Sequence, residues 1–132
     1  MPIRNPLDCA ISNFKTGHMK ILPGITNNPK LTDVLQKILK ELAWFIEWHS
    51  LYPEYFYYFF ENDSINEILY YLDRFLGIKR DSNWIEDVIS IWEIKKSYTY
   101  DKDLVALYRI YSKDMFKFYP AIRDRLLDFV EN

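Results

Sequence analysis

The fold of this chain is decided by residues 28–49, which read NPKLTDVLQKILKELAWFIEWH. Asn28 and Pro29 form a typical helix start, because asparagine caps helices and proline is tolerated in the first turn. After them, side chains suited to a protein interior recur at steps of three and four residues, the spacing of one helix face. These positions are Leu31, Val34, Leu35, Ile38, Leu39, Leu42, Phe45, Ile46 and His49. The segment therefore predicts a helix of about 20 residues with a broad apolar stripe.

The N-terminal side of this helix carries a weaker signal of the same kind. Asn5 and Pro6 predict a short helix, which Gly17 can close in a left-handed conformation. Residues 18–27 follow, interrupted by Pro23 and Gly24, and we expect them to form an extended connector. Residues 1–30 are thus predicted to be an irregular segment with one short helix.

The C-terminal side predicts several further helices. Pro53 restarts the chain as an aromatic helix over residues 52–60. Ser64 and Glu67 have the spacing of a capping box, in which the serine oxygen and the glutamate each satisfy an unpaired backbone amide. The other signals are a helix end at Gly77, helix starts at Asp81 or Ser82 and at Asp101, and a break at Pro120. A last helix then has Ile122, Leu126, Phe129 and Val130 on one side.

Composition agrees with a helical fold. The 132 residues include only three glycines, and no alternation of apolar and polar residues continues long enough for a regular strand. A chain of this length is near the commonest domain size. We therefore predict one all-α domain over residues 1–132, a bundle of five to seven helices in which residues 31–132 form the bundle itself.

Charge is distributed unevenly along the chain. Residues 41–73 contain seven carboxylates and no lysine or arginine, whereas the net charge of the whole chain is only −2. The same segment holds 12 of the 24 aromatic residues. Exposed aromatic side chains among carboxylates are typical of a surface that binds a basic partner.

Two interpretations of Trp44 and Trp48 remain open. Both project almost opposite to the apolar stripe of their helix and form a second ridge beside Lys37, Lys40 and Glu41. Burial of two indoles under a neighbouring element would stabilise the fold by several kcal/mol, which favours an internal position. The tyrosines of residues 52–71 cannot all share one interior, because consecutive helical residues point in different directions, so we expect some of them at the surface.

The sequence contains few residues suited to catalysis or to metal binding. It has two histidines and one cysteine, and no paired cysteine, histidine or glutamate–histidine spacing typical of a metal site. Its three glycines are too far apart for a phosphate-binding loop, and its basic residues form no stripe. We expect no catalytic, cofactor or metal residues, no nucleic-acid or membrane partner, and a cytoplasmic location, since neither a signal peptide nor a membrane span is evident.

The favoured hypothesis is a non-enzymatic module that neutralises or regulates one basic protein, such as a nuclease-type toxin. In this design it resembles the small acidic helical immunity proteins of bacterial toxins, an analogy that no motif carries. The alternatives are a self-associating structural or regulatory domain, whose homodimer uses the same ridge, a mimic of nucleic acid, and an enzyme built on carboxylates. The predicted partner-binding residues are Glu41, Trp44, Glu47, Trp48, Glu54, Tyr55, Tyr58, Glu67, Tyr70 and Tyr71.

Overall fold

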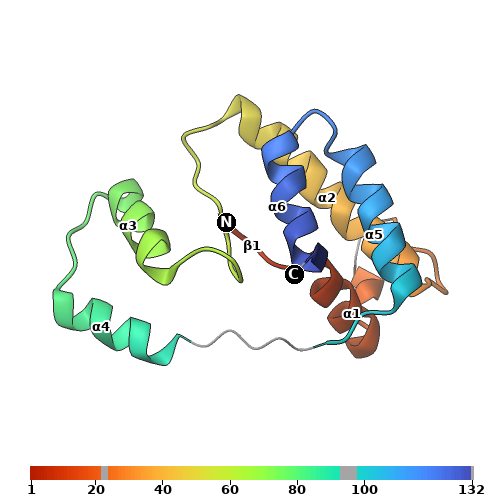
Figure 1. Cartoon of the computed structure of the whole chain (residues 1–132), viewed down its shortest axis with the longest axis horizontal. Helices are drawn as coiled ribbons and strands as arrows, with labels where there is room; N and C mark the ends of the chain where they lie inside the picture. Colours follow the sequence, from red (N-terminus) through yellow and green to blue (C-terminus); the bar gives the residue numbers. More distant parts are fainter. Residues whose placement is uncertain (22–23, 93–97, 132) are drawn as a thin grey trace. The chain divides into compact units, whose positions relative to one another are not determined.

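A computed structural model describes residues 1–21, 24–92 and 98–131, which form two compact units (Figure 1). Unit 1 consists of Met1–Arg4 and Tyr52–Lys96, and unit 2 of Asn5–Leu51 and Ser97–Asn132. The described residues contain six α-helices, one 3₁₀ helix and two strands of two residues each. The predicted all-α class with five to seven helices is therefore confirmed. The single domain over residues 1–132 stays a prediction, because compact units can belong to one domain or to two.

Unit 2 is built around the long helix that the sequence predicts. Helix α2 packs against α1 and α5, and α5 packs against α6, as the gold and blue ribbons of Figure 1 show. The bounds are α1 Pro6–Thr16, η1 His18–Ile21, α2 Leu31–Leu51, α5 Lys102–Met115 and α6 Pro120–Glu131. Its core contains Leu7, Ala10, Val34, Leu35, Leu39, Ile46, Leu104, Tyr108, Phe116, Ile122, Leu126 and Leu127.

Side-chain caps begin two of these helices where the sequence predicts them. The Asn5 side chain accepts a hydrogen bond from the Leu7 amide at 3.0 Å at the start of α1. The Asp101 carboxylate accepts from the amides of Asp103 and Leu104 at 2.9 and 3.2 Å at the start of α5. Each cap satisfies amides that have no partner within the helix, which fixes the first turn.

Unit 1 is smaller and has few buried side chains. Its elements are β1 Pro2–Ile3, β2 Tyr58–Phe59, α3 Ile65–Leu76 and α4 Ser82–Ile91. The strands pair in parallel, with Pro2 opposite Tyr58 and Ile3 opposite Phe59. Among its described residues, the buried apolar side chains are those of Ile3, Phe59, Ile68 and Leu69, and α4 buries none of its own residues.

The predicted aromatic helix over residues 52–60 is wrong. This segment contains turns followed by β2, whose backbone bonds to the N-terminal residues instead of to itself. The Phe60 amide donates to the Ile3 carbonyl at 2.9 Å, and the Phe59 amide donates to the Asp63 carboxylate at 2.7 Å. Aromatic residues have modest helix propensity and favour strands, so a strand partner decides their conformation.

Three smaller expectations also need correction. Residues 18–21 form a 3₁₀ helix and are not extended. Ser64 precedes α3 as its N-cap, but its side chain makes no capping hydrogen bond. The helical spacing after Asp101 also predicts Phe118 on the inner face of that helix, yet α5 ends at Met115 and the Phe118 side chain is 79% exposed. The sequence also predicts Lys95 and Lys96 at the C-terminal end of the helix that starts at Asp81 or Ser82, and these two lysines lie outside the described residues.

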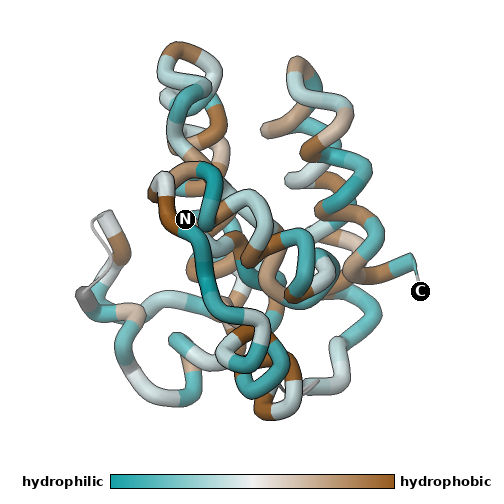
Figure 2. The backbone as a smooth tube through the Cα atoms, turned by 90° about the vertical axis from the view of Figure 1, so that its left-hand side faces the viewer, coloured by the Kyte–Doolittle hydropathy of each residue, from teal (hydrophilic) through white to brown (hydrophobic). Residues whose placement is uncertain are grey.

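Hydropathy along the chain is mixed. Short hydrophobic and hydrophilic stretches alternate along the backbone in Figure 2. Among the helices in the described part of the chain, none combines the length and the apolar character that crossing a membrane requires.

Candidate partner-binding surfaces

Four aromatic rings meet at the surface of unit 1, and we call them the aromatic cluster: Phe56, Tyr58, Tyr70 and Tyr71. The Phe56 ring centre lies 5.5 Å from that of Tyr58 and 6.2 Å from that of Tyr71. Tyr70 and Tyr71 meet edge to face at 5.4 Å. These separations suit aromatic pairs, so the rings support one another. The cluster thus joins β2 and the turn before it to α3.

The cluster is open to solvent on its α3 side. The side chains of Tyr70 and Tyr71 are 57% and 53% exposed. Glu67 is exposed one helical turn earlier, and its spacing of three and four residues places it on the same helix face as both tyrosines. One turn later, Arg74 donates a hydrogen bond to the Tyr70 hydroxyl at 3.3 Å. The cluster therefore has one negative and one positive neighbour.

The remaining predicted residues of unit 1 precede β2. Glu54 and Tyr55 are exposed in the turns after α2, and Tyr55 is 48% exposed. The Tyr55 amide donates to the Tyr52 carbonyl at 3.3 Å, which closes a turn. This segment presents an aromatic ring and a carboxylate at the surface of the same unit as the cluster.

Unit 2 carries a separate groove beside Trp44, which we call the tryptophan groove. Lys40, Ala43, Trp44 and Glu47 of α2 line it together with Met115, Phe118 and Tyr119, and its volume is about 440 Å³. The Trp44 side chain is 64% exposed. Of the two interpretations of this tryptophan, internal burial is wrong. The ring stands at the surface instead, with the 79% exposed Phe118 in the same groove.

Trp48 is placed differently from Trp44. It is half-buried, and its ring centre lies 5.9 Å from that of Phe45. Glu41 is exposed but bound to Lys37 at 2.6 Å, one turn earlier on α2. The expected ridge of two tryptophans is therefore one exposed ring and one ring that packs against its own helix.

Most carboxylates of residues 41–73 have partners within the protein. Besides Glu41, Glu61 pairs with Arg4 at 3.2 Å, Asp63 accepts the Phe59 amide, and Asp73 pairs with Arg80. Three remain exposed without an ion pair among the described residues: Glu47, Glu54 and Glu67. These three are the carboxylates best able to pair with a partner's cations, because a side chain with a fixed internal partner would first have to release it.

The structure thus divides the ten predicted residues between the two units. Glu41, Trp44, Glu47 and Trp48 belong to unit 2, and the other six to unit 1. Within unit 1, Tyr58, Tyr70 and Tyr71 come together in the cluster. Phe56 and Phe118 are not among the partner-binding residues that the sequence predicts. The only available signal for Phe118 was Pro120, which marks a helix start here and leaves the preceding residues in a connection.

The described residues offer no ligand set for a metal. No group of three or more histidine, cysteine, aspartate or glutamate side chains in that part of the chain could hold an ion. Comparison with known proteins gave no matching family model, no matching curated protein and no matching solved structure.

Proposed function

We propose that this chain is a non-enzymatic protein-binding module that neutralises or regulates one basic protein partner, in the manner of a toxin immunity protein or antitoxin. The observation that carries the proposal is the exposure of Tyr70 and Tyr71 in the aromatic cluster, next to the exposed carboxylate of Glu67. The proposed class of partner is a nuclease-type toxin, because such a protein presents a basic surface to which the exposed carboxylates can bind. The proposal includes a cytoplasmic location in the cell that makes the protein.

Exposed tyrosines support the proposal through their contribution to binding. Tyrosine and tryptophan are enriched among residues that each contribute about 2 kcal/mol or more at the centre of an interface. The rings of Tyr70 and Tyr71 meet edge to face, and the Phe56 ring centre lies 6.2 Å from that of Tyr71. Rings that are already held in place lose less conformational entropy when a partner covers them. The cluster is therefore a suitable anchor.

The exposed carboxylates support a basic partner rather than an acidic one. Glu54 and Glu67 lie in the same unit as the aromatic cluster, and neither has an ion pair among the described residues. Negative charge at the edge of an interface accelerates association with a positive surface, and salt screens this effect. We expect the association rate to decrease when the ionic strength rises.

The test is affinity capture from the native host with the wild-type chain and with a double variant, Tyr70→Ala/Tyr71→Ala. The expected result is one basic protein that is retained by the wild type and lost from the double variant. Ile110→Ala is the matched control, because Ile110 is a 60% exposed apolar residue on α5 in unit 2. Mass spectrometry identifies the retained protein.

The electrostatic part has its own measurement. Glu67→Lys should slow association of the captured partner by about tenfold or more at low salt, with a smaller effect at high salt. A partner retained equally by the wild type and by the double variant would contradict the role of the cluster. An association rate indifferent to both Glu67→Lys and salt would contradict the steering role.

Self-association is the second candidate, because α3, α4 and the connection between them expose apolar side chains. Phe75, Leu76 and Ile78 are 51%, 52% and 46% exposed, and Ile91 of α4 is 78% exposed. Apolar patches of this kind often mark interfaces. Light scattering distinguishes the two candidates, since a monodisperse monomer at micromolar concentration excludes a stable homodimer.

A further inference from the structure

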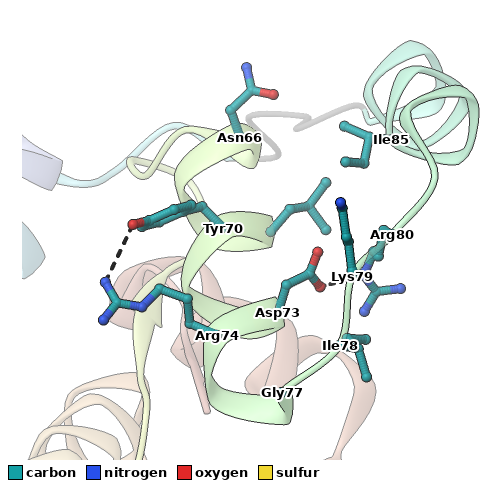
Figure 3. Close-up of a pocket in the computed structure, with 10 residues that line it drawn as sticks. Asn66, Tyr70, Asp73, Arg74, Gly77, Ile78, Lys79, Arg80 and Ile85 are labelled. Atoms are coloured by element: carbon teal, nitrogen blue, oxygen red, sulfur yellow. Dashed lines mark hydrogen bonds and ion pairs between the residues drawn. The ribbon is translucent and has the colours of Figure 1, made fainter.

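A pocket of unit 1 lies between the end of α3 and the start of α4, with a volume of about 480 Å³ (Figure 3). Gly77 shapes it by adopting a left-handed conformation with φ +67°. The Ile78 amide then bonds back to the Asp73 carbonyl at 3.1 Å, so the chain reverses after α3. This reversal brings Lys79 and Arg80 alongside α3, where they line the pocket.

Positive charge is concentrated at this pocket. Unit 1 has four basic side chains among its described residues, and three of them line the pocket: Arg74, Lys79 and Arg80. The fourth, Arg4, pairs with Glu61. Asp73 is the only carboxylate among the residues that line the pocket. The pocket is therefore positive in a unit whose other charges are mostly negative.

Two of these cations are available to an anion from one side of α3. Lys79 is exposed and has no hydrogen-bond or ion-pair partner in the described part of the chain. Arg80 uses its Nε atom to bond Asp73, and its guanidinium carbon lies 4.2 Å from the ring centre of Trp84. A guanidinium has five N–H groups, so Arg80 keeps donors beyond this bond. Arg74 turns to the Tyr70 hydroxyl on the other side of α3 (Figure 3).

The rest of the lining is largely apolar. Leu69, Ile78 and Ile85 contribute aliphatic side chains, and Asn66 contributes an amide. Pockets of about 300–1,000 Å³ with apolar walls and a few directed polar groups are typical of sites for small molecules. A bare inorganic ion would leave such walls uncovered.

We propose that this pocket binds a small organic anion whose carboxylate or phosphate contacts Lys79 Nζ and the guanidinium of Arg80 and whose apolar body covers Leu69 and Ile85. Asp73 orients Arg80 through their ion pair, and the Trp84 ring lies against the guanidinium. Tyr70 belongs both to the lining of this pocket and to the aromatic cluster, but the proposed anion contacts at Lys79 and Arg80 select the charge opposite to that of a basic protein.

The first experiment separates the anionic group from the apolar body. The full chain is titrated with phenyl phosphate, phenylacetate, benzyl alcohol and inorganic phosphate up to about 10 mM, which detects millimolar dissociation constants. Amide and indole NMR shifts report binding. We expect phenyl phosphate or phenylacetate to shift residues 66–85 and the Trp84 indole, and their relative affinities identify the preferred anion.

The second experiment removes charges one at a time. Lys79→Gln should weaken binding of the preferred anion by about tenfold, since it removes a charge-assisted hydrogen bond. Lys102→Gln is the matched control, because Lys102 is an exposed lysine in unit 2, and it should leave the affinity unchanged.

Several results of these two experiments would contradict the proposal. No binding of either organic anion, or benzyl alcohol bound as tightly as the anions, would overturn the proposal. Inorganic phosphate bound as tightly as phenyl phosphate would overturn the role of the apolar walls. An affinity that is the same for the wild type and Lys79→Gln would overturn the assignment to this pocket. None of these results depends on a protein partner, so the proposed function is tested separately.

Discussion

Tyr108 combines a buried ring with a buried hydroxyl. The ring is fully buried in unit 2, and the hydroxyl donates to the Leu126 carbonyl of α6 at 2.6 Å. Burial raises the pKa of Tyr108 above its ordinary value of 10.0. Above about pH 10 the tyrosine ionises in the unfolded chain before it ionises in the folded one, because the folded pKa is raised. The contribution of this hydroxyl to the free energy of unfolding is therefore complete below about pH 10 and is lost as the pH rises further.

Tyr108→Phe should therefore be less stable than the wild type at neutral pH, by about 1 kcal/mol for the lost hydrogen bond. The difference in the free energy of unfolding between the two proteins should shrink above about pH 10. Only the wild type has the ionising hydroxyl, so only its free energy of unfolding falls, by about 1.4 kcal/mol per pH unit. Urea unfolding at several pH values measures both effects. A difference that stays constant from neutral to alkaline pH would contradict the raised pKa.

Trp44 contributes little to the fold despite its size. Its side chain is 64% exposed, so truncation removes little buried surface. We expect Trp44→Ala to change the free energy of unfolding by less than about 1 kcal/mol, whereas truncation of a buried aromatic residue costs about 3–5 kcal/mol. Phe116→Ala is the matched comparison, because Phe116 is fully buried in unit 2. Equal losses for the two variants in urea unfolding would show that Trp44 is part of the core.

The position of Trp44 also shows a limit of prediction from the sequence. Helical spacing correctly placed Trp44 opposite the stripe that contains Leu35 and Ile46, both of which are buried. Spacing cannot say whether another element covers that opposite face. The aromatic segment that follows this helix, residues 52–60, contains β2, which pairs with residues 2 and 3.

At the scale of elements, the Gly77 turn couples stability to the proposed anion pocket. Alanine at position 77 meets no other atom within 4 Å, but φ +67° is unfavourable for any residue with a Cβ atom. Gly77→Ala should cost about 1 kcal/mol in the free energy of unfolding and weaken anion binding, since Lys79 and Arg80 follow the turn.

Gly17→Ala is the control for this prediction. Gly17 ends α1 in unit 2 with φ +74° and equally open surroundings. It should cost similar stability, measured by urea unfolding, and leave anion binding unchanged. Anion binding that is unaffected by Gly77→Ala would show that the turn does not position the two basic side chains.

Helix ends were predictable because their signals are local. Asn5, Asp81 and Asp101 all accept amide hydrogen bonds at helix starts, and Gly17 and Gly77 end helices as expected. The pairing of β1 with β2 was not predictable, because it joins residues about 55 positions apart and each strand has two residues. The aromatic cluster was therefore only partly predictable, since β2 and the turn before it supply two of its rings.

At the scale of the whole molecule, unit 2 is interrupted by a long insertion. Helices α1 and α2 precede residues 52–96, and α5 and α6 follow them. The core of unit 2 contains residues from both parts, such as Leu35, Leu39, Leu104 and Leu126. We infer that this core forms without unit 1.

A chain of residues 5–51 and 97–131 joined by a linker should therefore fold. Trp44 and Met115 line one groove, and α2 continues for seven residues beyond Trp44, so the linker must return about 10 Å along α2 and about 21 Å along the 14 residues of α5. About 12 glycine and serine residues suffice. We expect a helical circular dichroism spectrum and a cooperative urea transition. A gradual transition would show that unit 2 needs unit 1.

The route of the backbone has a consequence for cleavage. Residues 1–4 supply a strand to unit 1 before α1 and α2 begin unit 2, and the chain then returns to unit 1 at Tyr52. Hydrolysis of the peptide bond between Leu51 and Tyr52 would yield two fragments, and each fragment would contain part of both units. Neither fragment could complete either unit alone, so reassembly would be bimolecular and would depend on fragment concentration.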